Sequence, residues 1–209
     1  MKQPRLRKTL KKLVPKQAFR KVERQAHLAE SVVYSVANRF PGRKLKAIGV
    51  TGTNGKTTTT NLIFTMMREA GYNVALLSST AYGYKDDIMD EYEHMTTVPA
   101  PLLQKRLKEF VEKGAEWVVI EVSSHALAQY RTWSLPIEIA VMTNVTHEHL
   151  DYHGTFERYR DDKRKLFKLA ARTQRGLGVV YAEDPAAELF LSTTPRGVSY
   201  GIDEGELRA

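Results

Sequence analysis

The residues with the clearest chemical meaning form a short glycine-rich run at 49–57, Gly-Val-Thr-Gly-Thr-Asn-Gly-Lys-Thr. Glycines let the backbone wrap closely around a phosphate, and the amides at the start of the following helix point at its negative charge. The lysine supplies a point charge, and the threonine after it supplies an oxygen for Mg²⁺. The run therefore predicts a nucleotide-phosphate loop, with binding residues Gly52, Thr53, Asn54, Gly55, Lys56, Thr57 and Thr58.

A single carboxylate interrupts the apolar run at 117–122, Trp-Val-Val-Ile-Glu-Val. A glutamate inside a buried strand is costly unless it has a partner. Glu121 lies toward the carboxyl end of its predicted strand, where ligands bind in open α/β sheets. It could be a paired structural glutamate. Beside a phosphate loop we favour a metal ligand or a base that orients water.

Metal-ligating side chains gather in residues 143–154, TNVTHEHLDYHG, where three histidines and two acids lie within seven residues. A lone histidine is more often structural, but this density suggests function. The spacing of His147 and His149 does not match a pair of zinc ligands on a helix. Because a phosphate loop works with Mg²⁺, we favour that ion and keep zinc as the alternative.

A lysine stands on an apolar stripe of the helix predicted for 155–171. Residues at three- and four-residue spacing form that stripe: Phe156, Tyr159, Lys163, Leu166 and Ala170. One interpretation of Lys163 is a stem that covers the core while the ammonium reaches water. The other is a partly buried lysine whose lowered pKa makes it chemically reactive.

Alternating apolar runs and helical patterns must position these residues. Strands are predicted at 47–50, 73–79, 116–122, 137–145, 176–182 and 197–201. After the phosphate loop, helices are predicted to end at residue 70 and to span 99–113, 126–132 and 155–171, with a long functional loop at 80–98. Strands that alternate with helices pair in parallel through right-handed crossovers. The predicted fold class is α/β, a mostly parallel sheet with helices on both faces, preceded by a basic amphipathic helix.

The charge of the chain is unevenly distributed. The 209 residues have a formal net charge of +8, but residues 1–46 hold 14 Lys/Arg and 2 Asp/Glu, and the remainder is mildly acidic. The chain has no cysteine, which excludes disulfide scaffolds, thiolate zinc sites and cysteine nucleophiles. No apolar stretch approaches the ~20 residues of a membrane-spanning helix. We predict two parts, a basic helical leader at 1–45 and a phosphate-loop domain at 46–209.

The leader contains a helical pattern at 17–40 with a single apolar stripe: Phe19, Val22, Ala26, Ala29, Val33, Val36 and Phe40. We favour packing of this stripe onto the following domain. The alternative is an interfacial anchor, because an apolar stripe behind a polybasic segment suits an anionic membrane surface. Nucleic-acid binding is disfavoured because no aromatic platform accompanies the charge.

Together these motifs resemble the Mur ligases, most closely the central ATP-binding domain of the UDP-N-acetylmuramoyl-tripeptide synthetase (MurE) type. The matching segments occur in the family's order and cover about three quarters of the chain. They are GVTGTNGKTTTT (49–60), HMTTVPAP (94–101), EVSSHALAQYR (121–131), TNVTHEHLDYHG (143–154) and YRDDK (159–163).

The resemblance implies an ATP-dependent ligase of peptidoglycan precursor synthesis. A substrate carboxylate would take the γ-phosphoryl group to become an acyl phosphate, and the amine of an amino acid would then displace phosphate. ATP and Mg²⁺ are the implied cofactors, and the implied catalytic residues are Lys56 on ATP, Glu121 with Thr57 on one Mg²⁺, and His149 with a carbamylated Lys163 on a second. The residues implied to bind the UDP-muramoyl-peptide are Thr96, Thr97, Ser123, Gln129 and Arg131.

The chain departs from the family in three ways. The basic leader stands where the family has its uridine-binding domain, Glu148 stands where Asp is usual, and the sequence ends at Ala209 within the family's central domain. We expect the C-terminal domain that binds the amino acid to be supplied in cis or in trans. The 209 residues alone are not expected to be competent for ligation.

Two alternatives stay open: a non-catalytic, membrane-associated nucleotide-binding module, and a folylpolyglutamate or cyanophycin-type ligase. The HLDYHG and SSHALAQYR segments argue against the second. We expect a cytoplasmic protein, with peripheral attachment at the inner face of the membrane as a variant of that location. An anionic membrane surface is then a candidate partner of residues 1–40, and no nucleic-acid partner is expected.

Overall fold

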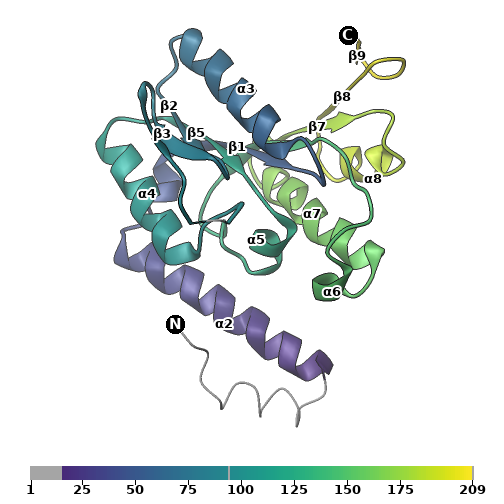
Figure 1. Cartoon of the computed structure of the whole chain (residues 1–209), viewed down its shortest axis with the longest axis horizontal. Helices are drawn as coiled ribbons and strands as arrows, with labels where there is room; N and C mark the ends of the chain where they lie inside the picture. Colours follow the sequence, from purple (N-terminus) through teal and green to yellow (C-terminus); the bar gives the residue numbers. More distant parts are fainter. Residues whose placement is uncertain (1–15, 94, 209) are drawn as a thin grey trace.

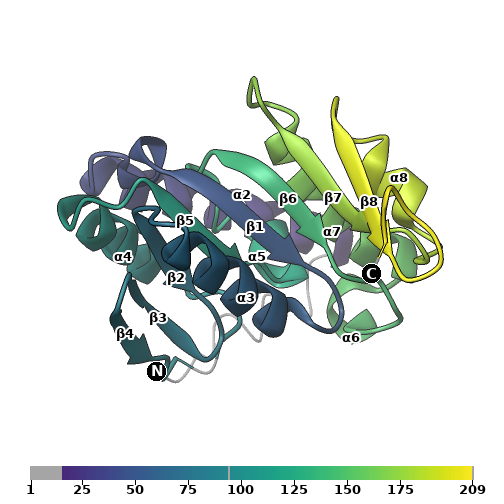
Figure 2. The same cartoon turned by 90° about the horizontal axis from the view of Figure 1, so that it is seen from above.

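The computed structural model describes residues 16–93 and 95–208, with side chains from residue 22 onward. The first part of the predicted leader, residues 1–15, lies outside the described residues. Within the described part, nine strands form one sheet in the order β4-β3-β2-β5-β1-β6-β7-β8-β9. Figures 1 and 2 show this sheet between layers of helices, as the predicted α/β class requires.

Seven neighbouring strands of the sheet are parallel. They are β1 (Lys46–Thr51), β2 (Val74–Leu77), β5 (Trp117–Glu121), β6 (Ile137–Met142), β7 (Leu177–Tyr181), β8 (Gly197–Gly201) and β9 (Leu207–Arg208). β1 pairs with β5 on one side and β6 on the other, so Val50 lies beside Glu121 and Thr51 beside Met142. The predicted phosphate loop, Glu121 and the histidine-containing loop therefore leave the sheet at the same edge.

Helices cover both faces of the sheet because the buried strands alternate their side chains between them. Ile48 and Val119 pack with Phe64 of α3 (Lys56–Glu69) on one face. On the other face, Ala47 and Val118 belong to the larger core. That core is covered by α4 (Ala100–Glu112), α5 (Ser124–Ala128), α7 (Phe156–Ala170) and α8 (Ala187–Leu191). Figure 1 shows α3 alone on its side of the sheet and α4, α5 and α7 on the other.

The segment 80–98, predicted as one long loop, contains two strands. β3 (Ala81–Tyr84) and β4 (Asp87–Asp90) form an antiparallel hairpin that continues the sheet from β2. The prediction was wrong because β4 is exposed along its whole length and shows no alternation of apolar and polar residues. Its strand character comes from pairing with β3.

The predicted packing of the leader helix was also wrong. α2 (Lys16–Ala37) lies against α4, and the short helix η1 (Pro41–Lys44) joins it to β1. From Val22 to Val36 the apolar stripe faces away from the protein, since Val22, Val33 and Val36 are 64%, 60% and 53% exposed. Of the other two members, Phe40 is half-buried, and the side chain of Phe19 lies outside the described residues. The side chains that face the domain include Ser31 and Ser35, both fully buried. The periodicity located the helix correctly but not the face it turns inward.

Candidate functional site

The phosphate loop joins β1 to α3 and needs its glycines for two reasons. A Cβ atom on Gly52 would lie 1.9 Å from Oγ1 of Thr143, so a larger residue has no space there. Gly55 precedes α3 with φ of 78°, in the left-handed region that glycine adopts without strain. Lys56 begins the helix and donates from Nζ to the carbonyl of Thr53 at 2.8 Å, so its charge already lies over the loop.

The first residues after β6 hold this loop in place. The amide of Asn54 donates to Oδ1 of Asn144 at 2.9 Å, and Thr143 Oγ1 donates to the carbonyl of Asn54 at 2.6 Å. Oγ1 of Thr53 accepts from the amide of Thr146 at 2.9 Å. The 143–146 segment therefore has a supporting role that its sequence did not reveal, because the contacts cross about 90 residues of chain.

Glu121 meets Thr57 at the carboxyl edge of the sheet. Its Oε2 accepts from Oγ1 of Thr57 at 3.0 Å, and from the amide and the hydroxyl of Ser79 at 3.0 and 2.8 Å. The carboxylate is 2% exposed, and these donors compensate its burial. Ser79 was missed as a site residue, although its place at the carboxyl end of the predicted strand 73–79 could have indicated it.

This cluster fits the metal and nucleotide that the loop suggests. Carboxylate and hydroxyl oxygens are the donors that Mg²⁺ takes in nucleotide sites, usually with one or two carboxylates and the phosphates. Thr57 and Glu121 place two such oxygens together just beyond the loop. The start of a 14-residue helix and the close-packed glycine at position 52 provide the backbone cradle that phosphates require.

Lys163 points into the same place from α7. The side chain is 2% exposed, and Nζ donates to the carbonyl of Gly52 at 2.5 Å and lies 4.5 Å from the ring centre of Tyr159. Burial, together with the nearby charge of Lys56, lowers the pKa of Lys163 to about 7. The interpretation of a lysine whose ammonium reaches water is therefore wrong, and the buried, reactive lysine fits the structure.

His147 lies apart from the other two histidines of the 143–154 segment, which both pack against His125. His147 stacks on Phe156, with ring centres 4.3 Å apart. His153 is buried, with Nδ1 2.8 Å from Asp162 and Nε2 3.0 Å from Ser124. Among the described residues no three His, Cys, Asp or Glu side chains form a metal-binding group. Part of the segment is a helix, α6 (Leu150–His153), rather than loop.

His149 is linked to the phosphate loop through Tyr159, whose hydroxyl lies 3.1 Å from Oγ1 of Thr53. It is half-exposed, it lies 3.6 Å from Oε2 of Glu148, and its ring contacts that of Tyr159, which also covers Lys163. Its backbone is left-handed, with φ of 53° and ψ of 32°. Non-glycine residues rarely adopt this conformation, and such strain concentrates at functional sites.

Four of the five predicted substrate-binding residues form one hydrogen-bonded group beside the phosphate loop. Thr97 donates from Oγ1 to the carbonyl of Glu121 at 2.9 Å and accepts from the amide of Ser123 at 3.0 Å. Arg131 donates to the carbonyl of Thr97 and, from Nη2, to Oε1 of Gln129 at 2.6 Å. Burial lowers the pKa of Arg131.

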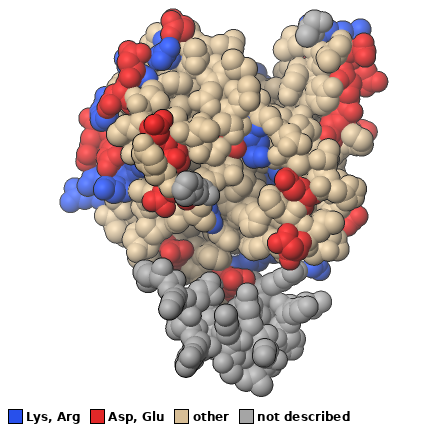
Figure 3. Space-filling model, in the orientation of Figure 1, with Lys and Arg blue, Asp and Glu red and all other residues tan. Residues whose placement is uncertain are grey.

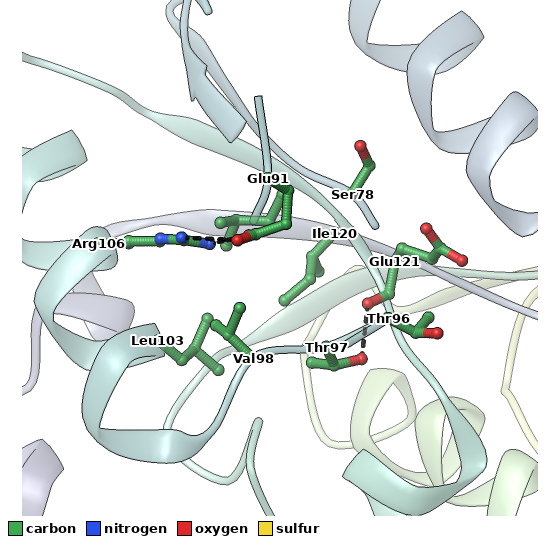
Figure 4. A pocket seen from close by; sticks show the side chains of 10 residues that line it. Ser78, Glu91, Thr96, Thr97, Val98, Leu103, Arg106, Ile120 and Glu121 are labelled. Atoms are coloured by element: carbon green, nitrogen blue, oxygen red, sulfur yellow. Dashed lines mark hydrogen bonds and ion pairs between the residues drawn. The ribbon is translucent and has the colours of Figure 1, made fainter. Parts of the chain in front are cut away.

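Thr96 and Thr97 line a pocket that also contains an ion pair the sequence did not predict. Figure 4 shows Glu91 and Arg106 pointing toward one another across it, and Thr97 reaching the backbone of Glu121. Arg106 contacts both carboxylate oxygens of Glu91, and the two side chains are 7% and 1% exposed. Burial opposes ionisation of Glu91, but the hydrogen bond from Arg106 holds its pKa below the usual range. The pair fixes α4 against the end of the β3–β4 hairpin.

Comparison with known proteins agrees with this geometry. The Mur ligase middle domain matches residues 50–209. A relative from Treponema pallidum, UDP-N-acetylmuramyl-tripeptide synthetase, is 39% identical over 165 residues, which are 74% of this chain and 31% of the relative. The chain thus spans about a third of the length of such relatives.

Solved structures share the fold. That of a UDP-N-acetylmuramoyl-L-alanyl-D-glutamate–2,6-diaminopimelate ligase has a TM-score of 0.68 at 32% identity, covering 78% of this chain and 33% of that one. Mycobacterium tuberculosis folylpolyglutamate synthase complexed with ADP has a TM-score of 0.67 at 14% identity, covering 83% of this chain and 46% of that one. The second likeness concerns the fold alone. From the matched residues 50–209, the chain belongs to the Mur ligase middle domain family.

Proposed function

We propose that this chain is the ATP-binding part of a ligase that joins an amino acid to a UDP-N-acetylmuramoyl-peptide in peptidoglycan precursor synthesis. The observation that carries the proposal is the meeting of Lys56, Thr57 and Glu121 at the start of α3. The two relatives at 39% and 32% identity are named as a UDP-N-acetylmuramyl-tripeptide synthetase and a UDP-N-acetylmuramoyl-L-alanyl-D-glutamate–2,6-diaminopimelate ligase, which supports the proposal. A folylpolyglutamate-type activity is the weaker alternative, because that likeness rests on 14% identity.

Within the proposed site, the chain's residues bind and neutralise charge. The phosphates would lie on the loop amides and Lys56, with one Mg²⁺ on Thr57 and Glu121 and a second on His149 and Lys163. ATP supplies the phosphoryl group that activates the substrate carboxylate. The protein's part is to hold two anions close together, as in phosphoryl transfer generally.

Lys163 suits an anionic ligand role only after modification. We propose that its neutral amine adds through nitrogen to the carbon of CO₂ and loses a proton to solvent, which gives a carbamate with two oxygens. Burial beside Lys56 supports this, because the lowered pKa leaves a substantial fraction of the amine neutral near pH 7. A neutral amine is the nucleophile that the addition needs.

The UDP-muramoyl-peptide would bind through Thr96, Thr97, Ser123, Gln129 and Arg131. Support comes from their common position beside Glu121 and from the buried guanidinium of Arg131, which suits an anionic substrate group. The incoming amino acid would bind to a C-terminal domain supplied in cis or in trans. We place the reaction in the cytoplasm, with residues 1–40 holding the protein at the inner face of the membrane.

ATP binding tests the nucleotide-binding part of the proposal. We expect Lys56→Ala to weaken Mg²⁺·ATP binding by about tenfold or more, measured by isothermal titration calorimetry. Lys105→Ala is the matched control, because the Lys105 side chain is 71% exposed on α4. Equal affinities of the two variants would contradict the phosphate-loop assignment.

Ligation itself is tested with the C-terminal domain of a relative fused to this chain or added in trans. ADP formation that depends on both the UDP-muramoyl-peptide and an amino acid supports the ligase. ATP binding without such turnover in any of these assemblies supports the non-catalytic nucleotide-binding module instead.

A further inference from the structure

A stripe of apolar residues on α2 points away from the protein. Helices on globular proteins turn their apolar stripe toward the core and their polar side toward water. On α2, Val22, Val33 and Val36 are more than half exposed. The inward side contains the buried Ser31 and Ser35 and the half-buried Leu28 and Val32. Ala26 and Ala29, which lie on the same stripe, are also exposed.

Hydrogen bonds fix this orientation. Ser35 Oγ donates to the carbonyl of Ser31 at 2.7 Å and lies 3.0 Å from Oγ of Ser134, which is itself held by Gln104 of α4 at 3.1 Å. Nearer the start of the helix, Arg24 lies 3.5 Å from the carboxylate of Asp162 on α7. Rotating the stripe inward would separate Ser35 from Ser134 and Arg24 from Asp162. The outward direction of the valines is therefore part of the folded structure.

The stripe is continuous and lies at the boundary of the molecule. Positions 22, 26, 29, 33 and 36 step by three or four residues and extend over about 20 Å at 1.5 Å per residue. Figure 1 shows α2 as the outermost layer, with α4, α5 and α7 between it and the sheet and α3 on the far side. A flat surface can therefore reach the stripe without covering α3.

Charge indicates which surface this is. Residues 1–21, which lead directly into the stripe, contain nine Lys/Arg and no Asp/Glu. On the face of the protein in Figure 3, by contrast, the described acidic and basic side chains are interspersed. Polybasic segments are attracted to anionic lipid, and adjacent apolar residues enter the boundary between headgroups and acyl chains. Protein interfaces of standard size use about 20–30 residues on each side, which five small side chains do not provide.

We propose that the outward face of α2, defined by Val22, Ala26, Ala29, Val33 and Val36, docks on an anionic lipid surface. This inference rests on the membrane part of the proposed function and not on the ligase part. The docked protein keeps α3 on the layer farthest from the lipid. None of the described helices is long and apolar enough to cross a bilayer, so the contact is peripheral.

The experiment is flotation of the full chain with vesicles of phosphatidylcholine alone or mixed with phosphatidylglycerol. The wild-type protein is expected to float with the mixed vesicles only, and less at high salt. Val33→Asp/Val36→Asp is expected to reduce the bound-to-free ratio about tenfold or more, because two apolar contacts are replaced by charges that the lipid repels. Leu62→Asp/Met66→Asp on α3 is the matched control and should float like the wild type, since those residues are 59% and 71% exposed.

The outcomes separate the proposals. If Val33→Asp/Val36→Asp floats like the wild type, the α2 face is not the docking surface, although attachment through the basic segment stands. If the wild type does not float, both the docking face and the membrane part of the proposed function are wrong. If the wild type sediments as a dimer that the α2 variant abolishes, the face binds a second copy and the proposal is overturned. Mg²⁺·ATP affinity, measured for all three proteins, reports separately on the ligase part.

Discussion

The carboxyl edge of the sheet and the outer face of α2 depart from ordinary burial in opposite directions. At the carboxyl edge, Glu121 and Lys163 are charged groups that lie inside the protein. On α2, Val33 and Val36 are apolar groups that lie outside it. Most soluble domains bury their valines and expose their charges. In neither region does the polarity of the side chain alone explain its burial.

The two regions differ in what completes them. Glu121 has three hydrogen-bond donors from Thr57 and Ser79, and Lys163 has the carbonyl of Gly52, so the carboxyl edge is ordered before any ligand binds. The valines of α2 have no comparable internal support, and only an outside surface can remove them from water. In the proposed anion site, hydrogen bonds hold the functional side chains themselves in place. On α2 the exposed valines make no such bonds, and their outward direction is set by contacts on the opposite side of the helix, such as that of Ser35 with Ser134.

The largest expected effect is at Lys163. In the reconstituted ligase, Lys163→Met should reduce ADP formation by about a hundredfold or more, because the variant cannot form a carbamate or place charge at the loop. Its free energy of unfolding should not fall, since a buried cation with a lowered pKa is replaced by an apolar side chain of similar length. Turnover assays and denaturant titration measure the two effects. Unchanged turnover would remove Lys163 from the site.

Glu121 is expected to show a smaller effect that depends on the metal. Glu121→Gln keeps an acceptor oxygen but loses the negative charge, so ATP affinity should fall about 10–100-fold with Mg²⁺ present and change little with EDTA. Glu116→Gln, an exposed change just before β5, serves as the control. Equal losses with and without Mg²⁺ would mean that Glu121 supports the fold of the loop rather than a metal ion.

The α2 half of the comparison is tested by two neighbouring residues. Ser35→Val should lower the free energy of unfolding by about 1–3 kcal/mol, because it overpacks the contact with Ser134 and removes two hydrogen bonds. Val36→Ser, one position away, should change it by less than about 0.5 kcal/mol. Urea unfolding followed by circular dichroism measures both. If the valine were the more costly to replace, α2 would be packed as its periodicity predicts.

Sequence patterns were sufficient where one segment contains the whole signal. The phosphate loop, the strand before it and the helix after it follow from the spacing of glycine, lysine and threonine. The place of Glu121 at the end of a buried strand predicted that it would share an edge of the sheet with Thr57. That β1 and β5 are neighbours, which brings the two side chains to 3.0 Å, depends on strand order and could not be predicted from either segment.

The features that were missed depend on contacts between distant segments. The β3–β4 hairpin has an exposed outer strand without alternation, and the ion pair of Glu91 with Arg106 joins that hairpin to another element. The inward face of α2 is chosen by close approach and hydrogen bonding of serines, whereas a helical period reports only apolar residues. For the same reason the sequence grouped the three histidines of the 143–154 segment, whereas in the structure His147 stacks on Phe156 and only His149 and His153 share a neighbour, His125.

The smallest expected effect concerns His125, which lies between the two regions on α5. Burial, and then the neighbouring His153 and His149, lower the pKa of His125 to about 4. In the unfolded chain the pKa of His125 is higher, about 6.5, so between pH 6.5 and 4 the unfolded state binds a proton that the folded state does not. The free energy of unfolding therefore decreases as the pH falls through this window. NMR titration should find a neutral imidazole at pH 6, and His125→Asn should lose less stability than the wild type between pH 7 and 4. A pKa of His125 near 6.5 would show that water reaches this ring. The ordered, buried structure found at the carboxyl edge of the sheet would then not extend to α5.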